Sequence, residues 1–397
     1  MVPDIREDYN NSFTNEKYQA FLEDLHSHYP GAIDFRIAET PEFIPGWFKE
    51  QIIDACEYII DIILDPGFKK ATDKAIPKGE NVPNETEHAH FLAFDFGICE
   101  NSKGELQPQL IEMQGFPTLF GFQAYYPEIV RKHFEIPSNY SHYFNGHTKE
   151  TYTKTLRELI VGDTPVENVI LLEITPHTQK TRVDFYCTKD LTGIEPVCIS
   201  DVYAEGKELY YNRNGIRTRI EKIYNRVIFD DLKTNKERLG NIIDITQDWN
   251  VKWITHPNWF YRISKYTLPF IKHACVPETY FLNELKQPPV DLEHYVLKPL
   301  FSFAGQGVVI DVTIDDLNKI EDPENWILQK KVKYADVIKT PDGGAKVEIR
   351  MMYIWKDGAA RPELVTNLSR LSKGKMIGVR YNKDKEWVGA SVAFFEQ

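Results

Sequence analysis

The sequence predicts an α/β (α+β) fold built from two or three packed units. Apolar residues recur at helical spacing in residues 14–28 and 46–64, which predicts two packing helices. Alternating or continuous apolar runs predict strands at residues 91–98 and 347–355, and a further strand at 169–172 in a separate small α/β unit. A chain of 397 residues is long enough for such units and a substantial core.

Composition excludes several classes of protein. The formal net charge of −12 argues against a general nucleic-acid binder, because basic surfaces hold phosphate backbones. No apolar run approaches the roughly 18 residues that a membrane span needs, and the polar, acidic start of the chain lacks a signal-peptide pattern. Five scattered cysteines without a C-x-x-C pair suggest neither a disulfide framework nor a zinc site. We therefore expect a cytoplasmic protein with no membrane or nucleic-acid partner.

Two polar side chains alternate in an apolar strand near residue 112. Because alternate side chains of a strand share a face, Glu112 and Gln114 can direct oxygen atoms to one point while Ile111 and Met113 turn toward a core. A carboxylate and an amide carbonyl are hard oxygen donors suited to Mg²⁺. The same alternation also fits an ordinary strand with a solvated face.

The preceding strand adds a third oxygen donor. Residues 91–98 carry Asp95 in an apolar run, and the turn at residues 101–104 lets this strand pair antiparallel with the next one. Asp95 would then lie beside Glu112. We therefore expect the metal ligands to be Asp95, Glu112 and Gln114.

A glycine-containing loop follows a strand in the last third of the chain. The strand is Tyr295–Pro299, and the loop contains Ser302, Gly305 and Gly307. Glycines let backbone N–H groups close on a polyphosphate without a Cβ in the way. Taken alone, such a loop is also compatible with a simple turn.

The order of these segments resembles circularly permuted ATP-grasp proteins related to the glutathionylspermidine synthase group. An ordinary ATP-grasp chain has, in order, a first lysine, a P-x-T stretch, a second lysine on a strand, a glycine loop and, at its end, the metal-binding strands. In this chain the P-x-T stretch lies at residues 276–279, but the metal-binding strands, at residues 91–118, come before it. The resemblance covers most of residues 90–397. It departs from the family at Gln114, where asparagine is usual.

The resemblance implies a circularly permuted ATP-grasp fold with a preceding small Rossmann-like pre-ATP-grasp domain, and ATP and Mg²⁺ as cofactors. In that domain a Y-N-R-V strand begins at Tyr224, and no G-x-G-x-x-G loop is present, so dinucleotide binding is not expected. The implied domains are an N-terminal helical segment (1–87), the permuted metal-binding part (88–160), the pre-ATP-grasp domain (161–255) and the nucleotide-binding part with the rest of the core (256–397).

The resemblance also implies roles for individual residues. Those expected to contact ATP are Lys265, Lys298, Ser302, Gly305, Gly307, Gln329, Lys330 and Val332, the last three in an adenine-binding linker at residues 326–332. Those expected to act in catalysis are Arg350, Arg370 and Asn367. Glu348 and Arg350 share a strand face, which a solvated ion pair would also explain.

The implied activity is an ATP-dependent carboxylate–amine ligase that forms an amide through an acyl phosphate. The partners would be a small-molecule or peptide carboxylate and an amine. Two alternatives stay open: a nucleotide-binding regulator without turnover, which Gln114 favours, and a kinase of the same fold. Arg182, Arg226 and Lys180 are candidates for holding an acidic substrate or are ordinary surface charges. His88 and His90 are expected to be strand-edge histidines because no third metal ligand is near.

Overall fold

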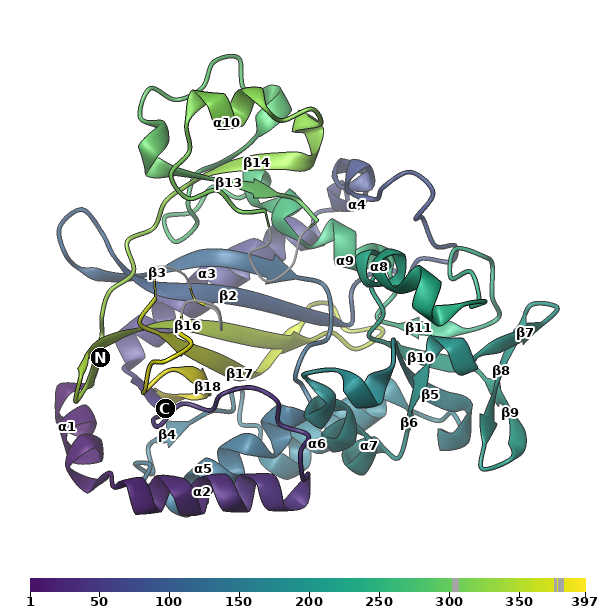
Figure 1. The fold of residues 1–397 in the computed structure, drawn as a ribbon, viewed down its shortest axis with the longest axis horizontal. Helices are drawn as coiled ribbons and strands as arrows, with labels where there is room; N and C mark the ends of the chain where they lie inside the picture. Colours follow the sequence, from purple (N-terminus) through teal and green to yellow (C-terminus); the bar gives the residue numbers. More distant parts are fainter. Residues whose placement is uncertain (302–306, 375–376, 378–381) are drawn as a thin grey trace.

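The computed structural model describes residues 1–301, 307–374, 377 and 382–397 (Figure 1). The predicted helices at residues 14–28 and 46–64 are confirmed, and the Thr14 hydroxyl caps the first by accepting from the Lys17 amide. The α-helices are α1 (Pro3–Ser12), α2 (Asn15–His28), α3 (Gly46–Leu64), α4 (Phe68–Ala71), α5 (Tyr126–His133), α6 (Lys149–Ile160), α7 (Arg182–Thr192), α8 (Phe229–Leu239), α9 (Asn258–Arg262) and α10 (Ile314–Asn318). The 3₁₀ helices are η1 (Asp73–Ala75), η2 (Phe122–Ala124), η3 (Val166–Asn168), η4 (Pro176–Thr178), η5 (Ile199–Asp201), η6 (Lys265–Phe270), η7 (Leu282–Glu284), η8 (Leu292–His294) and η9 (Pro323–Asn325).

The largest sheet joins the two ends of the chain. Its strands run in the order β18–β17–β16–β2–β3, and β15 pairs with β16. They are β2 (Phe91–Glu100), β3 (Leu106–Gln114), β15 (Ile338–Thr340), β16 (Gly343–Ile354), β17 (Glu363–Ser372) and β18 (Gly389–Ser391). Strands β2 and β16 are antiparallel neighbours, although Arg350 and its partner Asp95 are 255 residues apart in sequence. Residues 91–114 and Glu348 therefore lie in one sheet.

The two faces of this sheet differ in chemistry. Phe94 and Phe96 on β2 pack into one core with Ile52 and Ile59 of α3, which runs along the sheet in Figure 1. Because side chains alternate along a strand, Asp95 points to the other face. One face of the sheet is thus covered by α3, whereas the other carries the charged side chains together with Phe91, Met352 and Leu368, which belong to a second apolar core.

The predicted alternation of β3 is interrupted by a bulge. Asp95 pairs with Glu112, but the next residue of β2, Phe96, pairs with Leu110, so that Ile111 has no partner of its own. Met113 is buried as expected, whereas Ile111 is only half-buried. The bulge explains why these two residues do not share one buried face.

A small α/β unit lies beside the central sheet, as the sequence predicted. Its parallel sheet has the order β11–β10–β5–β6, with α7 after the first strand of the unit. These strands are β5 (Val169–Glu173), β6 (Glu195–Cys198), β10 (Lys222–Asn225) and β11 (Lys252–Ile254), and an adjoining antiparallel sheet contains β7 (Tyr203–Glu205), β8 (Glu208–Arg213) and β9 (Ile216–Ile220). Asn214 and Gly215 both have positive φ in the β8–β9 turn, the conformation that such a tight hairpin requires.

Two further sheets complete the fold. A small lobe, at the top of Figure 1 with α10, contains β12 (Thr279–Phe281), β13 (Tyr295–Pro299) and β14 (Trp326–Lys330) in the order β12–β14–β13. A second sheet contains β1 (Glu42–Ile44), β19 (Ala393–Glu396) and β4 (Tyr140–Ser141) in that order. Most of the predicted linker at residues 326–332 is therefore strand β14, which pairs on both of its edges.

No helix in the described ranges combines the length and the apolarity needed to cross a membrane.

Candidate functional site

Five charged side chains gather on the face of the central sheet opposite α3. Asp95 on β2 pairs in register with Glu112 on β3 and with Arg350 on β16. Glu348, two residues before Arg350, pairs with Arg370 on β17. Directly paired residues share a face, so these four strands present acidic and basic groups side by side.

Two of these acids are held by arginines. Arg350 is buried, and its Nε and Nη2 atoms donate to the two Asp95 carboxylate oxygens, at 2.6 Å each. Arg370 Nη2 donates to Glu348 Oε1 and lies 3.4 Å from Asp95 Oδ2. The Tyr334 hydroxyl donates a hydrogen bond to Glu348 Oε2 at 3.3 Å. Bidentate pairing fixes the relative orientation of the groups as well as their distance.

The environment keeps the two arginines charged. Burial lowers the pKa of Arg350, but the Asp95 carboxylate raises it more, so the net direction is upward. The pKa of Arg370 is raised, chiefly by Glu348. Burial raises the pKa of Glu348 itself, and Arg370 opposes that shift. Both guanidinium groups therefore stay charged at neutral pH.

Lys298 comes from the small lobe. On β13 it is half-buried, and its Nζ atom, 2.5 Å from Gln329 Oε1, donates to that oxygen. Gln329 Nε2 in turn donates to Thr279 Oγ1 at 3.2 Å, which fixes the amide orientation. Burial, with a smaller contribution from Lys265, lowers the pKa of Lys298 to about 8, while Glu112 opposes the shift. Gln329 therefore orients Lys298 from the adjacent strand.

Lys265 approaches the same place from η6. It is buried, and its Nζ lies 3.4 Å from the backbone oxygen of Leu300. Burial lowers its pKa, and Glu112 and Asp230 oppose that change. Because Lys265 also lowers the pKa of Lys298, the two cations lie within electrostatic reach of each other. Two neighbouring lysines that repel each other are suited to a polyanionic ligand.

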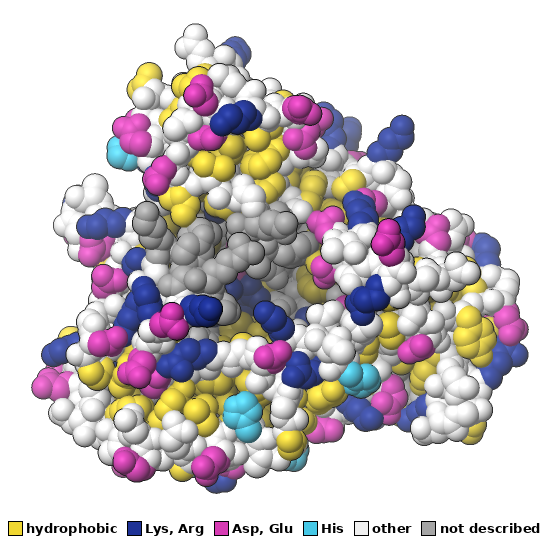
Figure 2. Space-filling model, viewed as in Figure 1, with side chains coloured by type: hydrophobic (Ala, Val, Ile, Leu, Met, Phe, Trp, Pro, Cys, Tyr) yellow, Lys and Arg dark blue, Asp and Glu magenta, His cyan; other side chains and the backbone are white. Residues whose placement is uncertain are grey.

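Glu112 and Gln114 face this pair of lysines. Both are half-buried and line, with Lys265 and Leu300, a cavity of about 20 Å³, which has room for roughly one water molecule. Within the described residues the Glu112 carboxylate makes no hydrogen bond or ion pair. Several Lys and Arg side chains lie on the face of the molecule below the small lobe in Figure 2.

The donor set fits Mg²⁺ in part. The ion commonly takes one or two protein ligands and completes its octahedral shell with phosphate and water, a demand that Glu112 and Gln114 meet. Asp95 differs, because both of its oxygens already accept from Arg350. Across the described residues there is no group of three or more His, Cys, Asp or Glu side chains placed to hold a metal ion. The role of Asp95 as a direct ligand stays a prediction.

Several other predicted site residues are not brought to this cluster. Asn367 is buried on the opposite face of β17, where its Nδ2 donates to the backbone oxygens of His142 and Ala393. Lys330 is exposed at the end of β14, and Val332 is half-buried beyond it. Ser302 and Gly305 lie outside the described residues. Gly307 has φ +75°, and a Cβ there would lie 3.0 Å from the Pro299 ring.

The basic residues proposed to hold an acidic substrate have other partners or positions. Buried Arg226 donates to the Pro117 carbonyl and lies over the ring of Phe116. Arg182 pairs with Asp34 at 3.5 Å. Lys180 is exposed. Arg226 therefore ties the α/β unit to the segment that follows β3.

His88 and His90, the two histidines expected at a strand edge, lie just before β2. His90 is fully buried, and its Nε2 lies 3.1 Å from Asp357 Oδ1. His88 stacks on the Trp355 ring, with 4.1 Å between ring centroids. Neither contact is a metal site.

Sequence reasoning missed two neighbours of the cluster. Asp230, at the start of α8, lies close enough to Lys265 to raise its pKa, but a first-turn acid looks like ordinary helix capping in a sequence. Tyr334 reaches Glu348 by passing over Gly97, where a Cβ would lie 2.5 Å from its ring. A glycine inside the β2 pattern was the available signal for that close approach.

The fold of this chain is similar to that of a glutathione synthetase-like protein. One solved structure that it resembles is a glutathione synthetase-like effector from Globodera pallida in its apo form, with a TM-score of 0.58 and 10% sequence identity. The likeness covers 97% of this chain and 98% of that one, which at this identity shows the fold alone. No family model matches the sequence. A search of curated proteins likewise gave no match.

Proposed function

We propose that this protein is an ATP-dependent carboxylate–amine ligase. One observation carries the proposal: Glu112 contributes to the pKa of Lys265, Lys298, Arg350 and Arg370, so one carboxylate lies within reach of four cations. This arrangement suits a ligand that is both polyanionic and metal-bound. ATP with magnesium is such a ligand.

The proposed reaction has two steps. A substrate carboxylate oxygen attacks the γ-phosphorus of ATP, the bond to the β-phosphate oxygen breaks, and ADP leaves. The amine nitrogen then attacks the acyl carbon, the C–O bond to phosphate breaks, and the nitrogen loses a proton. Phosphoryl transfer needs mainly positioning and neutralisation of charge, so no side-chain nucleophile is required.

The residues take roles that follow from their places. Lys265 and Lys298 hold phosphate oxygens from two elements, and Gln329 orients Lys298. Arg350 and Arg370 carry positive charge on the sheet face where the transferring phosphoryl group would lie. Magnesium, held through Glu112 and Gln114, would neutralise further phosphate charge.

The finer description of the fold belongs to the same proposal. The metal strands at residues 91–114 precede the lysines in sequence but pair with β16 in space, which supports a circularly permuted ATP-grasp order. The parallel sheet β11–β10–β5–β6 lies within residues 161–255, which supports a pre-ATP-grasp domain there. The amine and carboxylate would bind between that domain and the central sheet.

A second candidate is a nucleotide-binding regulator without turnover. The specific observation that favours it is the Arg350–Asp95 pair, because a carboxylate with both oxygens engaged is a poor metal ligand in that state. Gln114 in place of asparagine points the same way.

A phosphate-release screen separates these candidates. The protein is mixed with ATP, magnesium and pools of amino acids, polyamines and short peptides, and products are examined by mass spectrometry. The ligase reading requires phosphate and a new amide in equal amounts, both lost in Lys298→Ala. Nucleotide binding without phosphate release in any pool would favour the regulator, and a phosphate ester as the product would identify a kinase.

A further inference from the structure

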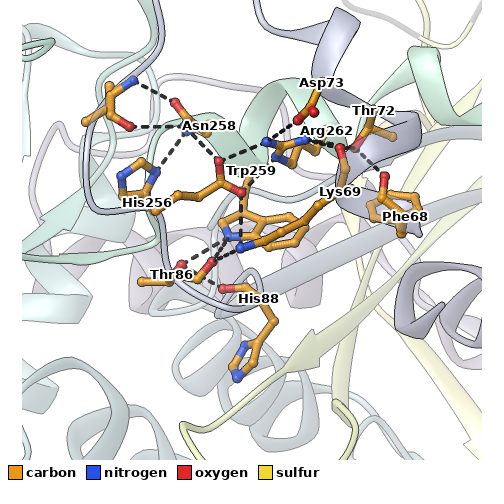
Figure 3. A network of polar contacts seen from close by, with 12 residues as sticks. Phe68, Lys69, Thr72, Asp73, Thr86, His88, His256, Asn258, Trp259 and Arg262 are labelled. Carbon is orange, nitrogen blue, oxygen red and sulfur yellow. Dashed lines mark hydrogen bonds and ion pairs between the residues drawn. The ribbon is translucent and has the colours of Figure 1, made fainter. Parts of the chain in front are cut away.

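Residues 65–87, named the strap here, lie across helix α9 and are fixed to it by polar contacts (Figure 3). The strap contains the short helices α4 and η1. Trp259 Nε1 donates to Thr86 Oγ1 at 3.0 Å, and Lys69 Nζ lies 5.3 Å from the centroid of the Trp259 ring. The strap is therefore an ordered support for α9.

Arg262 is the centre of these contacts. Its Nε and Nη2 atoms donate to the two Glu85 oxygens at 2.8 and 3.0 Å. Nη1 donates to the Lys69 carbonyl at 2.5 Å and to Thr72 Oγ1 at 3.1 Å, while Nη2 also lies 2.9 Å from Asp73 Oδ1. The guanidinium thus donates to four oxygen atoms and forms an ion pair with a fifth, all of them in the strap.

Asn258, one turn earlier on α9, repeats the pattern. Its Oδ1 accepts from the Val82 amide at 2.9 Å, and its Nδ2 donates to Glu85 Oε2 at 2.8 Å. Positions four apart share a helix face, so Asn258 and Arg262 both point to the strap. A helix of five residues has no stability of its own, and these contacts decide its orientation.

The other side of α9 meets the end of β3. The Gly115 amide donates to the Ile263 carbonyl at 2.9 Å, and a Cβ on Gly115 would lie 2.5 Å from the Trp259 oxygen. The Arg262 carbonyl accepts from Thr267 Oγ1 at 2.6 Å. The backbone that leads into Lys265 is therefore clamped between the strap and the residue following Glu112 and Gln114.

We infer that Arg262, held by Glu85, is a positioning residue that sets Lys265 opposite Glu112. The inference rests on the proposed function in one respect, that Lys265 contacts phosphate. A bidentate guanidinium–carboxylate pair fixes distance and angle together. A buried ion pair adds little stability over apolar side chains of the same volume, so its contribution here is orientation.

The test compares Arg262→Lys, which keeps the positive charge but cannot form the bidentate contact with Glu85, with the control Arg361→Lys. Arg361 also pairs with two carboxylates, Glu57 and Asp61, but on the surface of α3. Calorimetry measures binding of a non-hydrolysable ATP analogue with magnesium, and of adenosine, which has no phosphate. Amide hydrogen exchange follows residues 259–268 in the same proteins.

We expect Arg262→Lys to weaken binding of the ATP analogue about tenfold, because even a small displacement of Lys265 from the phosphate weakens their contact. Adenosine binding should be unchanged. The control should change neither. An equal loss for both ligands, or no loss in a variant with faster exchange at residues 259–268, would overturn the inference.

If the wild-type protein binds neither ligand, the proposed function fails. Amide hydrogen exchange at residues 259–268 then decides the inference. Faster exchange in Arg262→Lys than in the control would support the clamp, and unchanged exchange would overturn it. If Arg262→Lys does not fold, Thr72→Val serves instead, because it removes one acceptor of Arg262 at nearly constant volume.

Discussion

Arg350 and Asp95 form a bidentate ion pair between adjacent strands, although 255 residues separate them in the chain. This pair ties the segment that carries the candidate metal ligands to the segment that carries the candidate catalytic arginines. Arg370 lies 3.4 Å from the same carboxylate. The contact therefore joins two strands of the sheet and also balances positive charge at the site.

Replacing Asp95 by Asn should cost about 3 kcal/mol of unfolding free energy, because it leaves the buried Arg350 without its full counter-charge. Urea denaturation measures this change. Asp357→Asn is the matched control: Asp357 pairs with His90 and Lys252 near the surface and should cost at most about 1 kcal/mol. An equal loss of unfolding free energy in the two variants would show that burial does not make the Asp95–Arg350 pair more important for stability than a surface pair.

Lys298→Ala should weaken ATP binding roughly ten- to a hundredfold, because it removes a charge-assisted contact worth about 1.5 to 3 kcal/mol. Calorimetry on the folded variant gives the affinity. Lys286, an exposed lysine of the small lobe, provides the control Lys286→Ala. Unchanged affinity in Lys298→Ala would exclude this lysine from the phosphate site.

The affinity for ATP should fall as the pH rises through about 8. The pKa of Lys298 is lowered to about 8, mainly by burial, so the side chain is charged below that pH and neutral above it. Bound phosphate favours the charged form, and binding therefore takes up a proton in the alkaline range. Calorimetry from about pH 6.5 to about 9.5 follows the trend.

Lys298→Arg is the control for this pH dependence, because arginine stays charged throughout that range. The fall in affinity above pH about 8 should be flattened in this variant. An equally steep fall would assign the titration to another group.

Glu112→Gln should uncouple nucleotide binding from magnesium. Loss of the carboxylate removes its repulsion of phosphate, so ATP without metal should bind more tightly, while turnover with magnesium falls steeply. Magnesium titrations of binding and phosphate release measure both effects.

The neighbouring amide provides the comparison for Glu112→Gln. Gln114→Asn keeps the carbonyl donor and should be tolerated better than Gln114→Ala. Full magnesium-dependent turnover in a folded Glu112→Gln protein would remove residues 110–118 from the metal site.

The sequence predicted the elements of this fold better than their contacts. Helix 46–64 and strand Tyr295–Pro299 have the predicted bounds because continuous apolar patterns end at proline or charged residues. The pairing of β2 with β16 was accessible only through the order of the motifs, since nothing in local periodicity joins residues 255 positions apart.

The site was predictable in its residue types and less so in its geometry. Alternation placed Glu348 and Arg350 on one face, but it could not show that Arg350 would bind Asp95, because alternation within one strand does not set its register with a strand far away in sequence. Asn367 was assigned to the site by the resemblance, yet the strand period of two places it on the face opposite to Arg370. The strap was missed because its contacts are polar and irregular, without a repeating pattern.

The transfer of ¹⁸O from a labelled carboxylate substrate to phosphate tests the central claim most directly. Once the phosphate-release screen has found a substrate pair, the labelled acid is converted with ATP and the amine, and phosphorus NMR examines the released phosphate. An acyl phosphate intermediate requires one labelled oxygen in each phosphate, because the bond broken by the amine is the one between carbon and that oxygen. Amide formation with unlabelled phosphate, or with the label in AMP, would contradict the account.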